Sequence, residues 1–370
     1  MQYILYSCKM MKILDLVKTI ITVVLVLCIT AAVVQIPAYA AGKERQSSFD
    51  YKTYPDNEQY RNALYWLMND VYNTISKNMD DSKTLPIPGL IKTYSASKDK
   101  KKASKQFVPQ GICRAGRFWL VTAYDAKKEC RSVIYAVDPL MKELVATVVL
   151  PNRFHAGGIA FDGENIWITG DTSDKYKGEP FLQYITFLDF RKMIDEPVHL
   201  VKKNEISKPV YIKNVPSFLE YDNGTLWVGT YIGRKKTAES YMYGYKVLSD
   251  EKGVRLNTLL VTIISGIDSS AQGADIDGNN LYVSSSYQGG NIAIKSSYIT
   301  KYNIRPVKEG IQSFSVIGRE LRRIEVPKMN EEILVENGHV YINFESASEA
   351  WWTSVIKTDR ILSVDKSLWN

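Results

Sequence analysis

The sequence predicts an all-β fold built from five copies of one strand–turn–strand unit. Each copy holds a short apolar strand, a turn rich in Gly, Asp or Asn, and a second strand with an aromatic residue near its start. These aromatic residues follow one another at intervals of 48, 60, 55 and 59 residues, and they are Trp119, Trp167, Trp227, Tyr282 and Tyr341. Each interval has room for a third strand and usually a fourth. Four strands at a period of roughly 40–60 residues are typical of propeller blades, so we expect a five-bladed β-propeller over residues 107–370.

Residues 1–40 predict a secretory signal peptide. Three lysines precede an apolar run over 20–34, and the small-residue pattern Ala-Tyr-Ala ends the segment at 38–40. An uncleaved membrane anchor is the alternative, because the apolar stretch is nearly long enough to span a bilayer. The Ala-Tyr-Ala motif favours cleavage, so we expect a secreted, extracytoplasmic protein, of bacterial type, with no membrane segment after cleavage.

Residues 41–106 are expected to form a lead, a helix and a closing strand. Asp56 can cap a helix with Gln59 three residues later, and an apolar stripe continues towards Asn78 through Tyr60, Leu64, Leu67, Val71 and Ile75. The segment 90–95 reads as a short strand. The fifth repeat ends just after its third strand, at 361–364. We therefore expect 90–95 to supply its missing outer strand and to close the ring without an open edge.

Charge and cysteine content restrict the function classes. Removal of 1–40 takes away three Lys and one Asp, so the formal charge falls from +7 to +5. This charge is too small and diffuse to predict nucleic-acid binding. The densest basic run, 98–105, lacks interleaved aromatic residues and reads as a solvated loop. Cys113 and Cys130 remain in the mature chain, and the sequence leaves open whether they form a disulfide or two free thiols.

The ends of the repeat strands predict where a site lies. In a propeller, the start of each first strand and the end of each second strand meet at one central funnel. The first-strand positions are Gln110, His155, Ser217, Gln272, Glu331 and Glu332, and the second-strand positions are Tyr124, Asp171, Tyr231, Tyr287 and Glu345. Nearly all are polar or phenolic, while the strand interiors are apolar. Alternatively, each of these side chains has no role in a site and only forms hydrogen bonds to loop backbone or to water in the channel.

These residues allow two kinds of chemistry. A neutral imidazole beside carboxylates is suited to proton transfer, so the catalytic candidates are His155, Asp171, Glu331 and Glu345. Tyr, Gln and Ser suit stacking and hydrogen bonding, so the ligand-binding candidates are Gln110, Tyr124, Ser217, Tyr231, Gln272, Tyr287 and Glu332. No cofactor is predicted, although a divalent cation in the funnel, held by His155 with Asp171 or Glu345, remains open. Trp351 and Trp352 either pack between blades or form an aromatic rim over the funnel.

The third strand of the first repeat carries a recognisable motif at Ile134-Tyr135-Ala136-Val137-Asp138. This repeat pattern resembles that of secreted bacterial propellers of the NHL-like and glutaminyl-cyclotransferase-like kind, over about residues 107–370. The resemblance implies the ring architecture, and no catalytic motif transfers with it.

The sequence thus predicts a monomeric, exported propeller that binds a polar extracytoplasmic ligand, carbohydrate or peptide-like, in its funnel. The expected partner is a small polar ligand or a cell-envelope polymer. One alternative is a hydrolase or lyase that uses His155 with the funnel carboxylates. A second alternative is a protein-interaction scaffold. Whether the protein is an enzyme is left undecided by the sequence.

Overall fold

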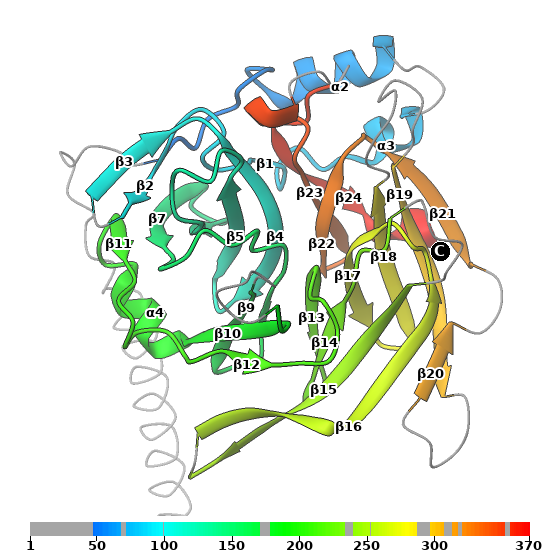
Figure 1. Cartoon of the computed structure of the whole chain (residues 1–370). Coiled ribbons are helices and arrows are strands. Elements are labelled where there is room, and N and C mark those ends of the chain that lie inside the picture. The colour runs from blue at the N-terminus through cyan, green and yellow to red at the C-terminus, as the bar shows by residue number, and fades with distance from the viewer. Residues whose placement is uncertain are drawn as a thin grey trace, which may run out of the picture. The chain divides into compact units, whose positions relative to one another are not determined.

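Five mainly antiparallel blades stand around a common axis in the computed structural model of the chain (Figure 1). The structure describes residues 47–67, 72–98, 100–170, 178–233, 240–251, 253–286, 297–306, 313–316, 320–351 and 356–370. The predicted signal peptide lies outside these residues. The expectation of a five-bladed propeller is confirmed.

Each blade runs from an inner strand at the axis to an outer strand at the rim. Blade 1 contains β4 (Phe107–Ala115), β5 (Phe118–Asp125), β6 (Val133–Asp138) and β7 (Glu143–Val149). Blade 2 contains β8 (Ile159–Phe161), β9 (Asn165–Thr169), β10 (Phe181–Thr186) and β12 (Val210–Tyr211). Blade 3 contains β13 (Phe218–Asp222), β14 (Thr225–Gly229), β15 (Ser240–Asp250) and β16 (Gly253–Ile267).

The last two blades complete the ring. Blade 4 contains β17 (Ala271–Asp277), β18 (Asn280–Ser286), β19 (Ser297–Pro306) and β21 (Arg322–Val326). Blade 5 contains β22 (Asn330–Glu336), β23 (His339–Phe344), β24 (Arg360–Asp365) and β1 (Leu85–Pro86). The strand β20 (Ser313–Val316) pairs with both β16 and β19, and so joins the outer parts of blades 3 and 4.

The five inner strands form a closed circle of neighbours. Strand β4 contacts β8, β8 contacts β13, β13 contacts β17, β17 contacts β22, and β22 returns to β4. The inner strands are short and mostly apolar or small, because each is covered on both faces by the neighbouring blades. Their starting ends all point to the same end of the axis, as the repeat alignment requires.

The ring is closed by an N-terminal strand, but not by the one expected. Leu85 pairs with Ile361 and Pro86 with Arg360, so β1 is the outer strand of blade 5. The expectation that 90–95 plays this part is wrong, because β2 (Thr93–Ser97) pairs instead with β3 (Lys100–Ser104). Prolines lie in and next to β1, at Pro86 and Pro88. A proline lacks the N–H of a ladder bond, however, and an outermost strand tolerates this because one of its edges is unpaired.

Blade 2 also differs from the expected strand assignment. The segment β11 (Val198–Leu200) follows the third strand of blade 2 in the sequence, but it pairs in parallel with β7 of blade 1. The outer strand of blade 2 is β12, which pairs with β10. A short helix, α4 (Phe187–Met193), follows β10 directly, with the Thr186 side chain accepting a bond from the Asp189 N–H as its cap. This helix carries the chain to the edge of the preceding blade.

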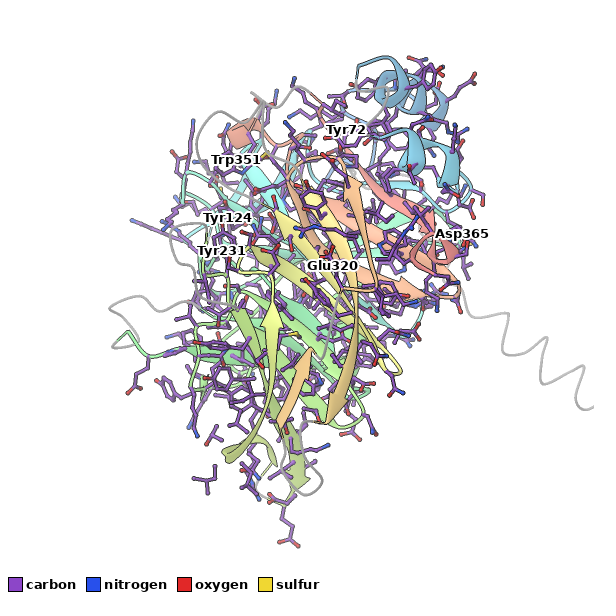
Figure 2. The ribbon with its side chains drawn as sticks, turned by 90° about the vertical axis from the view of Figure 1, so that its right-hand side faces the viewer. Tyr72, Tyr124, Tyr231, Glu320, Trp351 and Asp365 are labelled. Carbon is purple, nitrogen blue, oxygen red and sulfur yellow. The ribbon has the colours of Figure 1, made fainter. Side chains whose placement is uncertain are left out.

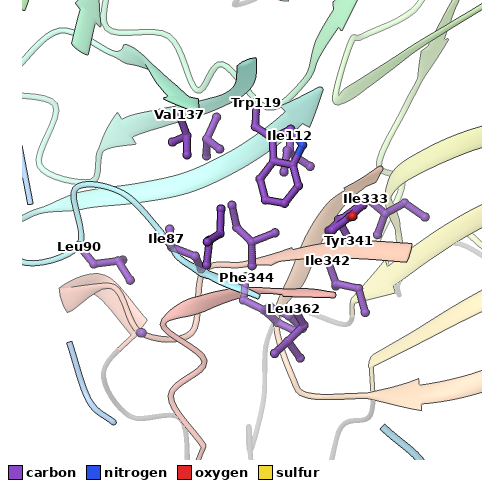
Figure 3. Packing of buried hydrophobic residues seen from close by; sticks show 14 of the residues in the cluster. Ile87, Leu90, Ile112, Trp119, Val137, Ile333, Tyr341, Ile342, Phe344 and Leu362 are labelled. Atoms are coloured by element: carbon purple, nitrogen blue, oxygen red, sulfur yellow. The ribbon is translucent and has the colours of Figure 1, made fainter. Parts of the chain in front are cut away.

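The N-terminal helices pack on blade 5. They are α2 (Asn57–Leu67) and α3 (Asn73–Asn78), and the buried residues Tyr60, Leu64 and Ile75 belong to the same apolar cluster as blades 1 and 5. Asp56 caps α2 by accepting a 2.7 Å bond from the Gln59 N–H. Figure 3 shows the interface of blades 1 and 5, where Trp119 and Ile112 lie close to Tyr341, Phe344 and Ile87.

A buried arginine ties the chain before α2 to blade 5. Arg360 on β24 is completely buried and forms an ion pair with Asp359. Its guanidinium also donates to the backbone carbonyls of Tyr54 and Asp56 and to the side chain of Asn57. We refer to this arrangement as the Arg360 clasp. At the other end of the chain, η4 (Lys366–Trp369) buries Trp369, whose Nε1 donates to the Ile299 carbonyl of blade 4.

Candidate functional site

Three of the inner strands begin with a β-bulge at the same end of the channel. The register shifts between Pro109 and Ile112 in β4, between Ala271 and Gly273 in β17, and between Asn330 and Ile333 in β22. A bulge adds a residue to one strand and re-aims its side chains. The bulged segments contain Gln110, Gln272 and Glu331, three of the predicted site residues.

These side chains gather with Glu345, which follows β23. Gln110 Nε2 lies 3.4 Å from Glu345 Oε2, and Gln272 Nε2 lies 3.4 Å from Glu331 Oε1. The Glu331 and Glu345 carboxyl groups are hydrogen-bonded to each other. We refer to these four residues as the mouth cluster. All four are at least nine-tenths buried.

The contact between the two carboxyl groups contributes to the raised pKa of Glu331. A hydrogen bond between carboxyl groups requires a proton on one of them, since two carboxylates repel. Burial is the main cause that raises the pKa of Glu331 well above its usual range, followed by the charge and the hydrogen bond of Glu345 and then by the charge of Glu332. Burial and the neighbouring negative charges thus favour the protonated form of Glu331.

Aromatic side chains lie next to this cluster. The ring of Tyr124 lies 4.5 Å from the imidazole of His155, tilted by 36°. Burial raises the pKa of Tyr124, and the charges of Glu345 and Glu331 add to this effect, which places the phenol beside the mouth cluster. His155 itself is exposed. Imidazole and phenol thus form a stacked pair over the buried carboxyl groups.

Blade 3 contributes a second aromatic residue. The Tyr231 N–H donates to Ser217 Oγ at 2.9 Å, so the end of β14 and the start of β13 are tied together at the mouth. Tyr124, Tyr231 and Trp351 lie along one side of the molecule in Figure 2, and Asp365 lies on the other side. Trp351 belongs to the short helix η3 (Glu349–Trp351) and is half-buried. The structure thus brings Gln110, Tyr124, His155, Ser217, Tyr231, Gln272, Glu331 and Glu345 to this end.

Glu332 lies elsewhere than the sequence suggested. Its Oε2 accepts bonds from the N–H groups of Ile112 at 3.0 Å and Ile159 at 3.4 Å, and its Oε1 accepts from Leu219 at 3.0 Å. The side chain therefore crosses the channel from blade 5 and bonds to blades 1, 2 and 3. A Cβ at Gly111 would lie 2.6 Å from Oε2, so glycine is needed there for the close approach. Glu332 thus holds backbone N–H groups of three blades, and its ligand-binding role stays a prediction.

A further group of carboxyl groups lies deeper in the channel and was not predicted. Asp275 on β17 accepts a 2.8 Å bond from the Val335 N–H, and Glu220 on β13 lies 3.5 Å from the Ile276 N–H. Burial raises the pKa of Asp275 to about 7, and burial together with the charge of Asp275 raises that of Glu220. The sequence signal was available, since both residues occupy the same position of the repeat, three residues after Gln272 and Ser217.

Polar side chains on the second strands join neighbouring blades at the mouth. Thr122 donates to the Ala156 carbonyl at 2.7 Å, Ser284 to the Glu331 carbonyl at 2.5 Å, and Asn343 to the Gln110 carbonyl at 2.7 Å. Ser284 and Asn343 thus reach the first strand of the following blade, β22 and β4, and Thr122 reaches the segment before β8. Sequence reasoning missed these residues because they lie inside the strands rather than at their ends.

Two predicted site residues, Asp171 and Tyr287, lie outside the described residues, as does Trp352. Within the described part of the chain, no three His, Cys, Asp or Glu side chains come together as a metal-holding group. Cys113 and Cys130 are both buried and both free. No helix among the described residues is long and apolar enough to cross a membrane.

A surface hollow of about 480 Å³ lies away from the mouth. It is lined by Arg61, Asp80, Asp81, His339 and Asp365, together with neighbouring residues at the end of α3 and in the segment that follows it. Arg61 forms an ion pair with Asp81 in this hollow, and His339 contacts Asp80. This hollow holds none of the predicted site residues.

Comparisons with known proteins identify no family. No protein-family model matches the chain, and no curated protein matches it. A chain of the Kuenenia stuttgartiensis hydrazine synthase structure is 11% identical with a TM-score of 0.34, and the match covers 64% of this chain and 55% of that one. The present chain thus spans about half of the hydrazine synthase chain. A chain in the crystal structure of the mitotic checkpoint complex is 6% identical, with a TM-score of 0.37 and coverage of 76% and 83%. Similarities at this level assign no function.

Proposed function

We propose that the protein binds a polar ligand, carbohydrate or peptide-like, at the mouth of the propeller. The arrangement that carries this proposal is the stacked pair of Tyr124 and His155 beside the buried mouth cluster. Ligand sites combine apolar or aromatic walls with a few fixed polar groups, and this arrangement has both. An aromatic face stacks on a sugar ring or a peptide plane, while the glutamines and carboxyl groups select hydrogen-bonding partners.

Export through a cleaved signal peptide is part of the proposal, and it rests on the sequence of residues 1–40 alone. A ligand outside the cytoplasm, such as a cell-envelope polymer or a small polar molecule, follows from that location. The NHL-like or glutaminyl-cyclotransferase-like resemblance remains a prediction from the repeat texture. A propeller fold suits binding and scaffold roles alike, so the preference for ligand binding depends on the residues at the mouth.

Binding is tested by calorimetry and thermal shift against sugars, cell-wall fragments and short peptides. We expect Tyr124→Ala to weaken binding of a detected ligand by about tenfold or more, which corresponds to ~1.4 kcal/mol. Tyr211→Ala is the matched control, because Tyr211 is an exposed tyrosine on the outer strand β12. If both variants weakened ligand binding equally, or if neither weakened it, the ligand would not bind at the mouth. Capture of a protein partner through other surfaces would favour a scaffold.

A hydrolase or lyase is the second candidate, favoured by the contact of the Glu331 and Glu345 carboxyl groups and by the raised pKa of Glu331. Such a pair supplies an acid and a base together. Two carboxyl groups in hydrogen-bond contact are closer than the roughly 5 Å or more that glycoside hydrolysis requires, so this pair does not fit that reaction. Product formation from a bound ligand, abolished in Glu345→Gln, would support turnover. Binding without product would leave the protein a binding module.

A further inference from the structure

Exposed basic side chains gather beside blade 1, next to the mouth. The β2–β3 hairpin lies beside this blade in Figure 1, and β2 contacts its strand β7. The basic run 98–105, expected as a solvated loop, instead supplies the strand β3, which pairs with β2. We define the basic face by six exposed residues of β3, of the loop after β5 and of the segment before β8, which are Lys100, Lys102, Lys105, Lys127, Lys128 and Arg153.

The charges of this face lie close to one another. Between residues 100 and 131, the described chain exposes one acidic side chain, Glu129. Its Oε2 accepts a 2.6 Å bond from Lys102 Nζ. The hydrogen bond and charge of Lys102 lower the pKa of Glu129 most, and the charges of Lys127 and Arg153 add to this effect. The guanidinium of Arg153 also donates to a backbone carbonyl of the same loop at 2.8 Å. Positive charges thus outnumber the one negative charge on a single surface.

The backbone that carries these side chains is held in place. The buried carboxylate of Asp125 accepts bonds from the N–H groups of Cys130 at 2.8 Å and of Lys127 at 3.2 Å, which fixes the loop after β5. The hydroxyl group of Ser95 on β2 donates to the Arg131 carbonyl at 2.6 Å, which joins the hairpin to that loop. A ligand therefore finds the backbone of the basic face already ordered, which reduces the entropy lost on binding.

The basic face continues into the mouth. Lys127 follows Tyr124 by three residues, and Arg153 precedes His155 by two. The rings of Tyr124 and His155 form the stacked pair, with their centres 4.5 Å apart. A chain molecule that crosses the loop after β5 thus passes from the cations to an aromatic pair and the polar groups beside it.

The residue types restrict the class of ligand. A lysine ammonium is a point charge that attracts acidic groups without a fixed geometry. Sites for single-stranded nucleic acid place aromatic rings among their cations, whereas the basic face contains no aromatic residue. An acidic peptide supplies carboxylates, but its acidic side chains offer Tyr124 no ring to stack on. A chain of acidic sugars supplies charges for the lysines, ring faces for Tyr124 and hydroxyl groups for the mouth cluster.

We propose that the basic face and the stacked pair together bind an acidic polysaccharide, a chain of sugars that carry carboxylate groups. The lysines attract carboxylates along the chain, while one sugar ring lies against Tyr124. The inference rests on the proposed function, because it names the class of carbohydrate that the mouth binds. Since the cations are exposed, salt must weaken the binding by screening them.

The test compares a galacturonate oligomer with its methyl ester, which has the same sugars without the charges. Calorimetry at about 50 mM NaCl should show the acidic oligomer to bind about tenfold or more tightly than the ester, and this preference should shrink at about 300 mM NaCl. The triple variant Lys100→Gln/Lys127→Gln/Lys128→Gln should weaken binding of the acidic oligomer by about tenfold or more and leave binding of the ester unchanged.

Lys142→Gln/Arg191→Gln/Lys192→Gln is the matched control. It also removes three exposed positive charges, from the turn between β6 and β7 and from α4, which lie at the opposite end of the blades from the mouth. Lys128 and Lys142 have φ angles of 54° and 53°, so each triple variant changes one residue of left-handed backbone. The control should bind the acidic oligomer like the wild type, and thermal unfolding checks that both variants fold.

Equal binding of the oligomer and its ester, with Tyr124→Ala weakening both, would overturn the inference and leave the proposed function standing. Binding of the oligomer that is lost in the triple variant but unchanged in Tyr124→Ala would also overturn it, because the chain would then not reach the mouth. Tighter binding of polyglutamate or of a thymidine oligonucleotide would assign the basic face to another polyanion and would contradict the inference. No binding of galacturonate or alginate oligomers would do so as well.

Discussion

The guanidinium carbon of Arg360 lies 4.1 Å from the centre of the Tyr51 ring and 4.4 Å from that of the Tyr60 ring. An arginine on the last strand of the ring is thus enclosed by one aromatic residue from the chain that precedes α2 and one from α2 itself. Asp359 completes the arrangement by accepting a 2.6 Å bond from the Thr53 N–H. The Arg360 clasp therefore holds the N-terminal segment against the blade that β1 closes.

Replacement of Arg360 should lower the free energy of unfolding, because Arg360 holds the N-terminal segment against the blade that closes the ring. In Arg360→Met, the carboxylate of Asp359 stays buried without its cationic partner, and the loss of one member of a buried pair typically costs about 3–5 kcal/mol. Urea unfolding measures this change. Arg360→Lys tests the geometry, since an ammonium retains the charge but lacks the planar fork that reaches Tyr54, Asp56 and Asn57. An unchanged unfolding midpoint in Arg360→Met would show that the clasp does not stabilise closure.

Glu332 should behave as a structural residue rather than a ligand contact. In Glu332→Gln, one carboxyl oxygen becomes an NH₂ group that faces backbone N–H donors, and we expect a loss of about 1–3 kcal/mol in unfolding free energy. Glu336→Gln is the control, because Glu336 forms only a half-exposed ion pair with Arg114 and should lose about 1 kcal/mol or less. If Glu332→Gln impaired ligand binding with full stability retained, the structural assignment would be wrong.

Asp275 should make stability depend on pH near neutrality. Burial raises its pKa to about 7, with further increases from Asp277, Asp222 and Glu336, so the folded state holds a proton that the unfolded chain releases at about pH 4. The folded state therefore binds more protons between about pH 4 and pH 7, and stability must fall as pH rises through this window.

The corresponding test is Asp275→Asn followed by urea unfolding at several pH values. The amide can still accept the Val335 N–H bond, so the variant should match the wild type at about pH 4. Above about pH 7 it should be more stable, by on the order of a few kcal/mol, because no charge is buried. Parallel stability curves for the two proteins across the window would rule out this assignment.

The two cysteines should be inert in the folded protein. Cys113 and Cys130 are buried, and burial raises the pKa of both, that of Cys130 to about 11. The thiolate is the reactive form, so both thiols combine poor access with little thiolate at neutral pH. Mass spectrometry after treatment with a thiol reagent should find both unmodified in native protein and both modified in denaturant. Rapid labelling of either in the native state would contradict the burial.

The number of blades could be predicted because each second strand carries an aromatic residue at the same position. The polar character of the mouth was predictable for the same reason, since strand ends recur with the repeat. The directions of Glu331 and Glu332 were not, because a bulge decides which of two adjacent side chains faces the mouth and which crosses the channel. Nothing in the residue types distinguishes two consecutive glutamates.

The Arg360 clasp escaped prediction for a different reason. Its partners Tyr51 and Tyr54 lie about 300 residues earlier in the chain, and a contact at that separation leaves no local pattern. The closing strand was misplaced because Leu85 and Pro86 form only two pairs with β24, too few to show an alternating pattern. In both cases the decisive partner is a distant segment of the chain.

The length of the Glu332 side chain also limits the number of blades that the ring can hold. One side chain of fixed length spans the distance from blade 5 to the N–H groups of Ile112, Ile159 and Leu219. A ring with a sixth blade would have a wider channel, and the same carboxyl group would then leave backbone donors of the far strands unbonded. Insertion of a duplicated blade into this chain would thus destabilise the ring at its axis, even if every new sheet folded correctly.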